Sequence, residues 1–409
     1  MERMLTAKSF DSFTKAVKSL RGELSATPER IVKEMFSRLD SIDWKNPDLK
    51  ILDPAAGFGT FLREAYIRLK EFHSEEHIIN NMLYACEING FKTFFLEKKM
   101  GLRNIYKGDF LTMKLPEGWP KEFNIVVSNP PYGTRTNKLD LKFIEKSLDL
   151  FSERMVIVHP ASSYIDVKDN NKYYQEINRK TSEFLEEIVL FNGNGVFEIG
   201  PLTPCSIISL NRKKEVNGIR IKNLMLDRED FGEIDKLTPW GIRPEFYSFK
   251  EKISGHTNGS LHSEGNVLGT RGIPELRNSE CFFVEFSSIR TGVINGGDIN
   301  EKMYLPQFFT FISKNNLVIN QGRNPEYKIW FEFSSSSEAS NFLTYLKTDF
   351  ARMCLALSKT NSHLDNGELK SIPWMDFSQV WTDDKLFKHF NVSQEERNFI
   401  SEIIPPYYD

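Results

Sequence analysis

Short apolar runs alternate with amphipathic stretches along the first half of the chain. The amphipathic stretches at residues 31–39, 60–70, 90–100 and 139–151 predict helices. The apolar runs predict strands at residues 50–53, 82–86, 104–106, 123–127, 155–159, 186–191 and 205–211. Strands separated by helices are typical of an α/β fold with a doubly wound parallel sheet.

The pattern changes after residue 212. Glycines become frequent, and short alternating runs predict strands at residues 282–286 and 308–312 in a mixed, β-rich region. Towards the end, Ser335 with Glu338 and Ser393 with Glu396 have the spacing of capping boxes, which predict two helix starts. We therefore expect three segments: residues 1–212, 213–335 and 336–409.

The segment Asn129-Pro130-Pro131-Tyr132 directly follows the apolar run at residues 125–127. Two prolines end a strand and stiffen the chain that leaves it. Such a turn lies at the carboxyl end of a strand, where open α/β sheets bind ligands. It offers the amide of Asn129, the carbonyl of Pro130 and the ring of Tyr132. Two acceptors and a stacking surface suit a planar group that bears an NH2, either the amino edge of a nucleobase or a side-chain amide.

Residues 53–61 form a glycine-containing loop between a predicted strand and a predicted helix. Gly57 and Gly59 permit positive φ and close approach of a ligand to the backbone. The amino end of the following helix attracts a negative group such as a carboxylate. The loop lacks the lysine and the spacing of a nucleotide phosphate loop, which argues against a nucleoside triphosphate site.

Two acids follow the next predicted strands. Glu87 after the second strand is placed to bind the hydroxyls of a ribose. Asp109 after the third is placed to accept from an adenine amino group, with Phe110 beside the ring. Together with the glycine loop and the Asn-Pro-Pro-Tyr turn, they predict a nucleoside-cofactor site.

Composition narrows the class of protein. Hydrophobic residues make up 40% of the 409 residues and include 33 Phe, enough for a sizeable core. The net charge of −3 allows nucleic-acid binding only through a local basic face. The four cysteines form no C-x-x-C pair. His73 and His77 have helical i, i+4 spacing, but Ser74 stands where the zinc-protease pattern has Glu, so we expect no metal site. No targeting segment and no apolar run of membrane-spanning length is expected, which indicates a cytoplasmic protein without membrane contact.

The order of these motifs resembles the S-adenosylmethionine-dependent DNA adenine-N6 methyltransferases, in the γ arrangement of the amino-methyltransferases. Asp53-Pro54-Ala55-Ala56-Gly57-Phe58-Gly59 is similar to their first motif, although many members carry Cys and Ser where Ala56 and Phe58 stand. The resemblance implies S-adenosylmethionine as cofactor, bound by Thr27, Pro28, Asp53, Ala55, Gly57, Gly59, Glu87, Ile88, Asp109 and Phe110. It implies Asn129, Pro130 and Tyr132 as catalytic residues and Pro131 and Phe197 as residues that bind an extrahelical adenine.

The same resemblance assigns roles to the three segments. Residues 1–212 would be a Rossmann-like methyltransferase domain, residues 213–335 a target-recognition domain that binds DNA, and residues 336–409 a helical extension packed with it. The expected partners are double-stranded DNA and a cognate restriction or specificity subunit.

Three alternatives stay open. A methyltransferase that acts on a protein glutamine amide uses the same turn, because that amide presents the same NH2. A methyltransferase that acts on an RNA base is a second, and a DNA-binding modification subunit without turnover is a third. Thr27-Pro28 ahead of the glycine loop and the long second half favour DNA, and the intact Asn129 and Tyr132 favour turnover.

Overall fold

The computed structural model divides into two compact units, residues 1–242 and residues 243–409. It describes residues 27–133, 137–161, 164, 172–193, 196–197, 204–215, 217–224, 227–234, 237–238, 241–254, 256, 282–286, 317–321, 329–333, 335–358 and 372–404.

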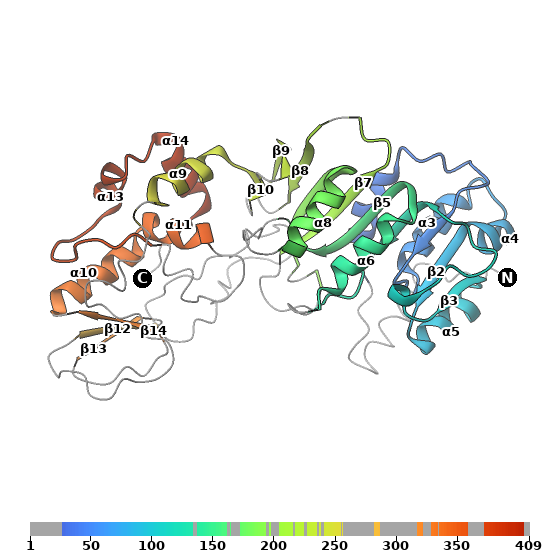
Figure 1. Ribbon diagram of the computed structural model, residues 1–409, viewed down its shortest axis with the longest axis horizontal. Coiled ribbons are helices and arrows are strands. Elements are labelled where there is room, and N and C mark those ends of the chain that lie inside the picture. Colours follow the sequence, from blue (N-terminus) through green and yellow to red (C-terminus); the bar gives the residue numbers. More distant parts are fainter. Residues whose placement is uncertain are drawn as a thin grey trace. The chain divides into compact units, whose positions relative to one another are not determined.

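A sheet of nine strands forms the centre of the first unit (Figure 1). Its strands are β1 (Ile51–Asp53), β2 (Leu83–Glu87), β3 (Asn104–Lys107), β4 (Phe123–Ser128), β5 (Phe151–Pro160), β6 (Leu185–Asn192), β7 (Pro204–Asn211), β8 (Ile219–Asn223) and β9 (Arg228–Gly232). Their spatial order is β3-β2-β1-β4-β5-β7-β6-β8-β9. A short antiparallel hairpin of β10 (Leu237–Thr238) and β11 (Gly241–Ile242) follows.

Strand direction in this sheet is mixed. Strands β3, β2, β1, β4 and β5 are parallel, and the chain order reverses between β1 and β4. Strand β7 lies between β5 and β6 and is antiparallel to both, and β9 is antiparallel to β8. The Rossmann-like α/β class with a doubly wound sheet is therefore confirmed, and the sheet departs from parallel pairing only at β7 and β9.

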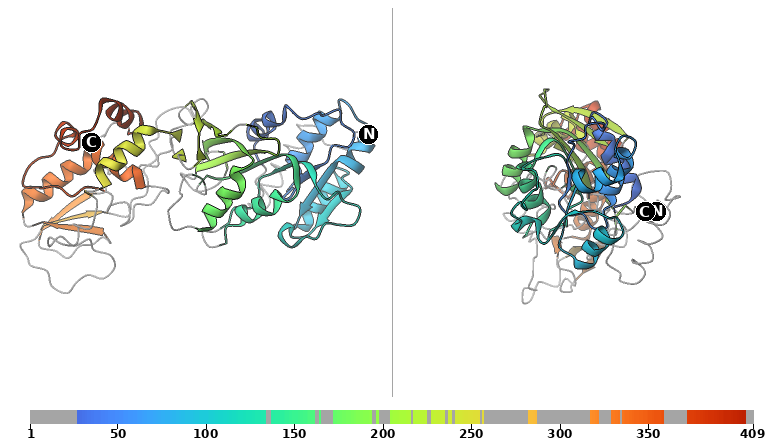
Figure 2. Two further views of the ribbon diagram at one scale, coloured as in Figure 1. Left: turned by 45° about the horizontal axis from the view of Figure 1, so that its top comes forward. Right: turned by 90° about the vertical axis from the view of Figure 1, so that its right-hand side faces the viewer.

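Helices cover both faces of the sheet. They are α2 (Glu29–Phe36), α3 (Thr60–Leu69), α4 (Glu75–His77), α5 (Gly90–Lys98), α6 (Leu139–Leu148) and α8 (Lys172–Ser182), with short turns η1 (Ser37–Leu39), η2 (Ile78–Met82) and η3 (Phe110–Thr112). Helices α2 and α3 lie on one side, and α6 with α8 on the other (Figure 2). Met35, Phe36 and Leu62 pack against the face that carries Ile125 and Val127, which removes their apolar surface from water.

The sheet extends beyond the expected boundary at residue 212. Strand β8 pairs in parallel with β6, and β9 pairs with β8, so residues 219–232 belong to the same sheet. The helix expected at residues 139–151 ends at Leu148, because Phe151 opens β5.

The second unit contains α9 (Pro244–Ser254), α10 (Ser336–Lys347), α11 (Asp349–Ser358), α13 (Asp383–His389) and α14 (Gln394–Ile403). It also contains an antiparallel sheet of β12 (Phe282–Phe286), β13 (Leu317–Gln321) and β14 (Ile329–Phe333), in the order β13-β12-β14. Ser335 caps α10 by accepting from the backbone N–H of Glu338 at 3.1 Å, and Ser393 with Glu396 forms a full capping box on α14. The strand expected at residues 308–312 lies outside the described residues. In the part of the chain that the structure describes, every helix is too short or too polar to cross a bilayer.

Candidate active site

A cavity of ≈ 690 Å³ lies at the carboxyl ends of β1, β2, β3 and β4. This is the place where the strand order reverses, the usual ligand position in an open α/β sheet. Most residues that the sequence predicted for the site line it: Thr27, Ala55, Gly57, Glu87, Ile88, Asp109, Phe110, Asn129, Pro130, Pro131, Tyr132 and Phe197.

The three remaining predicted residues do not line the cavity, but each is next in the chain to a residue that does. The carbonyl of Pro28 accepts from the backbone N–H groups of Ile31 and Val32 at the start of α2. Gly59 caps α3 with φ at 76°, and a Cβ there would lie 2.5 Å from the Sδ of Met100. The conformation and the close neighbour both require glycine at this position.

The third of these residues, Asp53, is fully buried at the end of β1. Its Oδ1 accepts from the backbone N–H of Ala55 at 3.0 Å and from the hydroxyl of Ser128 at 3.2 Å, which joins β1 to the end of β4. Its Oδ2 has no hydrogen-bond partner among the described residues. Burial raises the pKa of Asp53 to about 7, so the carboxyl group keeps its proton over most of the acidic range.

The carboxylate of Glu87 joins two loops at the cavity. Its Oε2 accepts from the backbone N–H of Gly57 at 2.8 Å, and its Oε1 accepts from that of Asn89 at 2.8 Å. Each carboxylate oxygen has a second lone pair, so Glu87 keeps acceptor capacity for ligand hydroxyls.

The loop after β3 is held from α6. Asp109 caps the η3 turn by accepting from the backbone N–H of Leu111 at 2.9 Å. The ammonium group of Lys146 donates to the carbonyls of Phe110, Leu111 and Met113 at 2.6, 3.1 and 2.7 Å. Burial lowers the pKa of Lys146. No sequence pattern indicated Lys146, because its partners are backbone carbonyls more than thirty residues earlier in the chain.

The amide of Asn129 has one used and one unused end. Its Nδ2 donates to the hydroxyl oxygen of Thr27 at 3.0 Å. Its Oδ1 is shielded from bulk water and has no hydrogen-bond partner among the described residues. A buried acceptor without a donor is costly, so this oxygen is suited to a donor that a ligand brings.

Aromatic side chains form one wall of the cavity. The ring of Tyr132 meets that of Phe197 edge-on, with centroids 6.2 Å apart and planes at 87°. Phe197 also contacts Phe191 of β6, at 6.3 Å between centroids. Burial, with the Cys205 thiol nearby, raises the pKa of the Tyr132 phenol well above its ordinary value, so Tyr132 is neutral at physiological pH.

Several lining residues were not predicted from the sequence. Phe58 packs edge-on against Phe95 at 5.3 Å, and Lys92 lies 5.9 Å from the Phe58 ring. Leu139 and Phe143 of α6 also line the cavity. Of these four residues, Phe58 alone had a signal in the sequence, because it lies inside the glycine loop.

The two histidines with helical spacing bind backbone carbonyls. The Nε2 atoms of His73 and His77 lie 2.9 and 2.8 Å from the carbonyl oxygens of Trp44 and Pro47. Within the described ranges, no three side chains of His, Cys, Asp or Glu are grouped so that they could hold a metal ion.

Comparison with known families gives one match. Residues 9–163 match the family model for N-6 DNA methylases, which spans the glycine loop, both acids and the Asn-Pro-Pro-Tyr turn. This is less than half of the chain. At the level of the family, the match confirms the resemblance to DNA adenine-N6 methyltransferases. No curated protein matches the sequence.

Several solved structures are similar to parts of this chain at low identity. A modification subunit assigned to a type I restriction enzyme of Vibrio vulnificus YJ016 is 14% identical with a TM-score of 0.43, over 53% of this chain and 51% of that one. A methyltransferase subunit of a type I restriction-modification system from Streptococcus thermophilus is 15% identical with a TM-score of 0.41, over 49% of this chain and 47% of that one. The type IIG restriction endonuclease BpuSI is 13% identical with a TM-score of 0.45, over 94% of this chain and 67% of that one. The chain thus spans about half the length of the two subunits, and at these values the likeness carries no conclusion about activity.

Proposed function

We propose, from the premise that residues 9–163 form an N-6 DNA methylase domain, that the chain transfers a methyl group from S-adenosylmethionine to the N6 amine of adenine in a specific double-stranded DNA sequence. The observation that carries the proposal is the unused, buried Oδ1 of Asn129 beside the carbonyl of Pro130, in a cavity that also holds the glycine loop and two acids.

The residues around the cavity fit this cofactor. Gly57 has φ at 55°, and a Cβ there would meet only the carbonyl of Ala55, at 4.0 Å. This open space lets a ligand approach the backbone at the amino end of α3, where a carboxylate is favoured. Glu87 would bind the ribose hydroxyls, and Asp109 with Phe110 would bind the adenine ring of the cofactor. When bound, S-adenosylmethionine supplies an electrophilic methyl group on a positively charged sulfur.

The turn would prepare the attacking nitrogen. The N6 lone pair of adenine is delocalised into the ring, so the amine is a poor nucleophile. Asn129 Oδ1 and the Pro130 carbonyl would each accept a hydrogen bond from one of its two N–H groups. This favours a tetrahedral nitrogen with an exposed lone pair. The N–C bond would form as the methyl group leaves sulfur, and these two acceptors would stabilise the positive charge that appears on nitrogen. The surplus proton then leaves for water, so no strong general base is required.

Tyr132 would stack on the target adenine, with Phe197 and Pro131 beside it. The target lies inside a duplex, so we include base flipping in the proposal. Flipping costs a few kcal/mol, which stacking partly offsets.

Double-stranded DNA is the proposed partner, and a cognate restriction or specificity subunit is a second. A cytoplasmic location stays a prediction.

The second unit is the proposed site of sequence recognition. We move the start of the expected recognition segment from residue 213 to residue 243, because β8 and β9 are part of the methyltransferase sheet. Residues 336–409, proposed as its helical extension, contribute α10, α11, α13 and α14 to this unit.

The test is methyl transfer from tritiated S-adenosylmethionine by the full chain. Duplex DNA, transfer RNA and a release factor are offered separately, and labelled DNA is digested to identify N6-methyladenine. We expect label in duplex DNA. Label only in transfer RNA or only in the release factor would instead support one of the alternative substrates and reject DNA.

Asn129 provides the matched variants. Asn129→Ala removes both ends of the amide, so we expect turnover to fall at least about a hundredfold while the cofactor Kd from calorimetry stays within about threefold. Asn129→Asp keeps an acceptor and should retain more activity than the alanine variant. Near wild-type turnover of Asn129→Ala would refute the assigned mechanism.

A further inference from the structure

Thr27 and Asn129 are 102 residues apart in the chain and share one hydrogen bond at the cavity. Asn129 donates its Nδ2–H to the hydroxyl oxygen of Thr27 at 3.0 Å, and both residues line the cavity. The resemblance implied that Thr27 binds the cofactor. The contact connects its hydroxyl to the proposed catalytic amide.

An asparagine amide has nearly the same shape after a half-turn about its last bond. The half-turn exchanges an acceptor oxygen for a donor NH2 group. If the NH2 end faced an adenine amine, donors would meet donors and the lone pair would stay delocalised. Something must therefore select the amide orientation before the base arrives.

Thr27 is rigid enough to make that selection. Its side chain is branched at Cβ, which restricts χ1, and it precedes Pro28, which restricts its backbone to extended conformations. Only 8% of the residue is exposed. The helix that follows, α2, is anchored near its start by the buried side chains of Ile31 and Val32.

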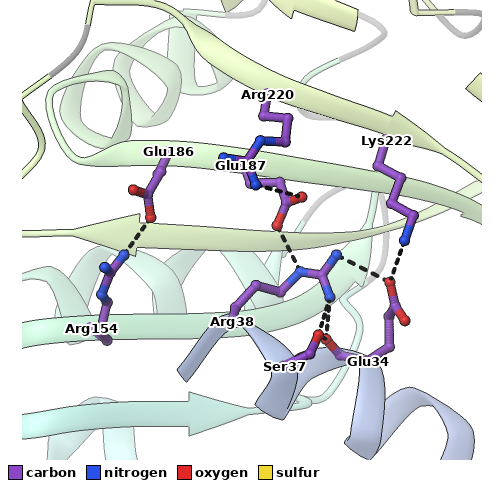
Figure 3. A network of polar contacts seen from close by, with 8 residues as sticks. All are labelled: Glu34, Ser37, Arg38, Arg154, Glu186, Glu187, Arg220 and Lys222. Carbon is purple, nitrogen blue, oxygen red and sulfur yellow. Dashed lines mark hydrogen bonds and ion pairs between the residues drawn. The ribbon is translucent and has the colours of Figure 1, made fainter. Parts of the chain in front are cut away.

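Polar contacts fix the far end of the same helix. Figure 3 shows that Arg38, just after α2, pairs with Glu34 of α2 and with Glu187 of β6. The Arg38–Glu187 distance is 2.8 Å, and each of these two side chains is 9% exposed. Thr27 therefore begins a segment that is held at both ends.

We propose that Thr27 is a positioning residue, whose hydroxyl oxygen accepts from Asn129 Nδ2 and so keeps Oδ1 available for the N6 amine. The role of Asn129 Oδ1 as acceptor for the N6 amine rests on the proposed function. The Thr27–Asn129 hydrogen bond does not depend on it. Thr27 acts through Asn129, so its loss lowers the rate of methyl transfer more than the affinity for the cofactor.

The first test compares Thr27→Val with Thr27→Ser in the full chain. Valine keeps the branched shape and removes the hydroxyl, and serine keeps the hydroxyl. We expect Thr27→Val to lower kcat roughly tenfold, the effect of one hydrogen bond, with the cofactor Kd within about threefold. Thr27→Ser should recover most of the rate. Weaker cofactor binding with unchanged kcat in the valine variant, or a serine variant as slow as valine, would overturn the proposal.

The second test uses Asn129→Asp as background. Both oxygens of aspartate accept, so its orientation no longer matters. Thr27→Val should then lower kcat by less than about twofold beyond the Asn129→Asp variant alone. An equal loss in both backgrounds would show that Thr27 does not act by orienting the amide.

A third measurement is independent of activity. The measurement is the NMR signal of the Asn129 side-chain NH2 group in a chain labelled with ¹⁵N-asparagine. This signal is identified as the one that is missing from the spectrum of Asn129→Asp. Its protons should exchange slowly with solvent in the wild type and in Thr27→Ser, and faster in Thr27→Val. Equal exchange in all three rejects the hydrogen bond. If the wild type transfers no methyl group to any substrate while the exchange pattern holds, the proposed function fails but the contact stands.

Discussion

A single buried carboxyl group, that of Asp53, connects the two loops that face the cavity. Its Oδ1 accepts from the backbone of Ala55 in the glycine loop and from Ser128, the last residue of the strand before the Asn-Pro-Pro-Tyr turn. Among the residues that the structure describes, no cation is in hydrogen-bond contact with Asp53, so its ionisation opposes folding rather than favouring it.

This makes stability depend on pH in a defined direction. The pKa of Asp53 is about 7 in the folded chain and 3.8 ordinarily, so the folded state binds more protons between these values. The free energy of unfolding therefore falls as pH rises from about 4 to 7. The side chain of Asp53→Asn has no proton to lose. At pH 8 the free energy of unfolding of this variant should therefore exceed that of the wild type by on the order of 3 kcal/mol. Denaturant unfolding without cofactor at pH 4 and pH 8 measures this difference.

The free energies of unfolding of the wild type and Asp53→Asn should be most alike at pH 4, where both side chains are neutral. This comparison serves as the internal control. A difference of the same size at both pH values would contradict the assignment to Asp53.

At this scale the sequence indicated most of the site. The glycines, Glu87, Asp109 and Asn129 follow predicted strands, and position after a strand determines which edge of the sheet a residue reaches. The contact of Asn129 with Thr27 was not predictable, because it depends on how α2 packs on the sheet and not on any local pattern. Lys146 was missed for the same reason.

At the scale of elements, charged side chains connect α2 and the η1 turn to the outer strands (Figure 3). Arg38 pairs with Glu187 of β6, and Lys222 of β8 pairs with Glu34 of α2 at 3.5 Å. Four elements contribute to this network, so no spacing in the sequence reveals it.

Removing one partner from this network should be costly. Arg38→Met would leave Glu187 buried without its main cation, since Arg220 lies farther away, at 3.9 Å. We expect the free energy of unfolding to fall by about 3 kcal/mol. Lys33→Met is the matched control, because Lys33 pairs with Glu29 on the exposed side of the same helix and should change little.

Urea unfolding of the two variants and the wild type measures both effects. Adding Glu187→Gln to Arg38→Met should recover part of the lost stability. Equal, small losses in Arg38→Met and Lys33→Met would show that the buried pair contributes nothing.

Local signals predicted several elements correctly. The amphipathic stretch at residues 31–39 lies within α2 and η1, and the Ser335 and Ser393 caps lie where their spacing indicated. The direction of β7 was not predictable, because an apolar run has the same pattern in either direction. The spacing predicted where α10 starts but not where it ends: α10 stops at Lys347, and a second helix, α11, starts at Asp349.

At the scale of the whole molecule, the two compact units divide between Ile242 and Arg243. The sequence suggested residue 212, because composition changes there. It could not show that Ile219 and Ile221, with exposed fractions of 2% and 0%, complete a sheet begun far earlier in the chain.

Truncation distinguishes these boundaries. A chain of residues 1–242 should unfold cooperatively and bind S-adenosylmethionine with a Kd within about threefold of the full chain, because the cavity lies entirely in this unit. It should not methylate a specific DNA sequence. A chain of residues 1–212 lacks β8 and β9, which leaves β6 as an unprotected edge, and should aggregate or melt lower.

Thermal unfolding by circular dichroism, calorimetry with the cofactor and a methylation assay on duplex DNA check these three outcomes. Equal stability of the two truncated chains would show that the two outer strands are dispensable.

The reversed direction of β7 also determines which side chain lies next to the phenol of Tyr132, namely Cys205. In register, Cys205 at the start of β7 lies opposite Pro160 at the end of β5, so the thiol arrives at the ligand-bearing edge. Had the strand run with its neighbours, its last residues would have reached that edge in place of the first. Any exchange of the β6–β7 hairpin with that of another enzyme would therefore also replace the backing of the aromatic wall, even if every motif residue were left untouched.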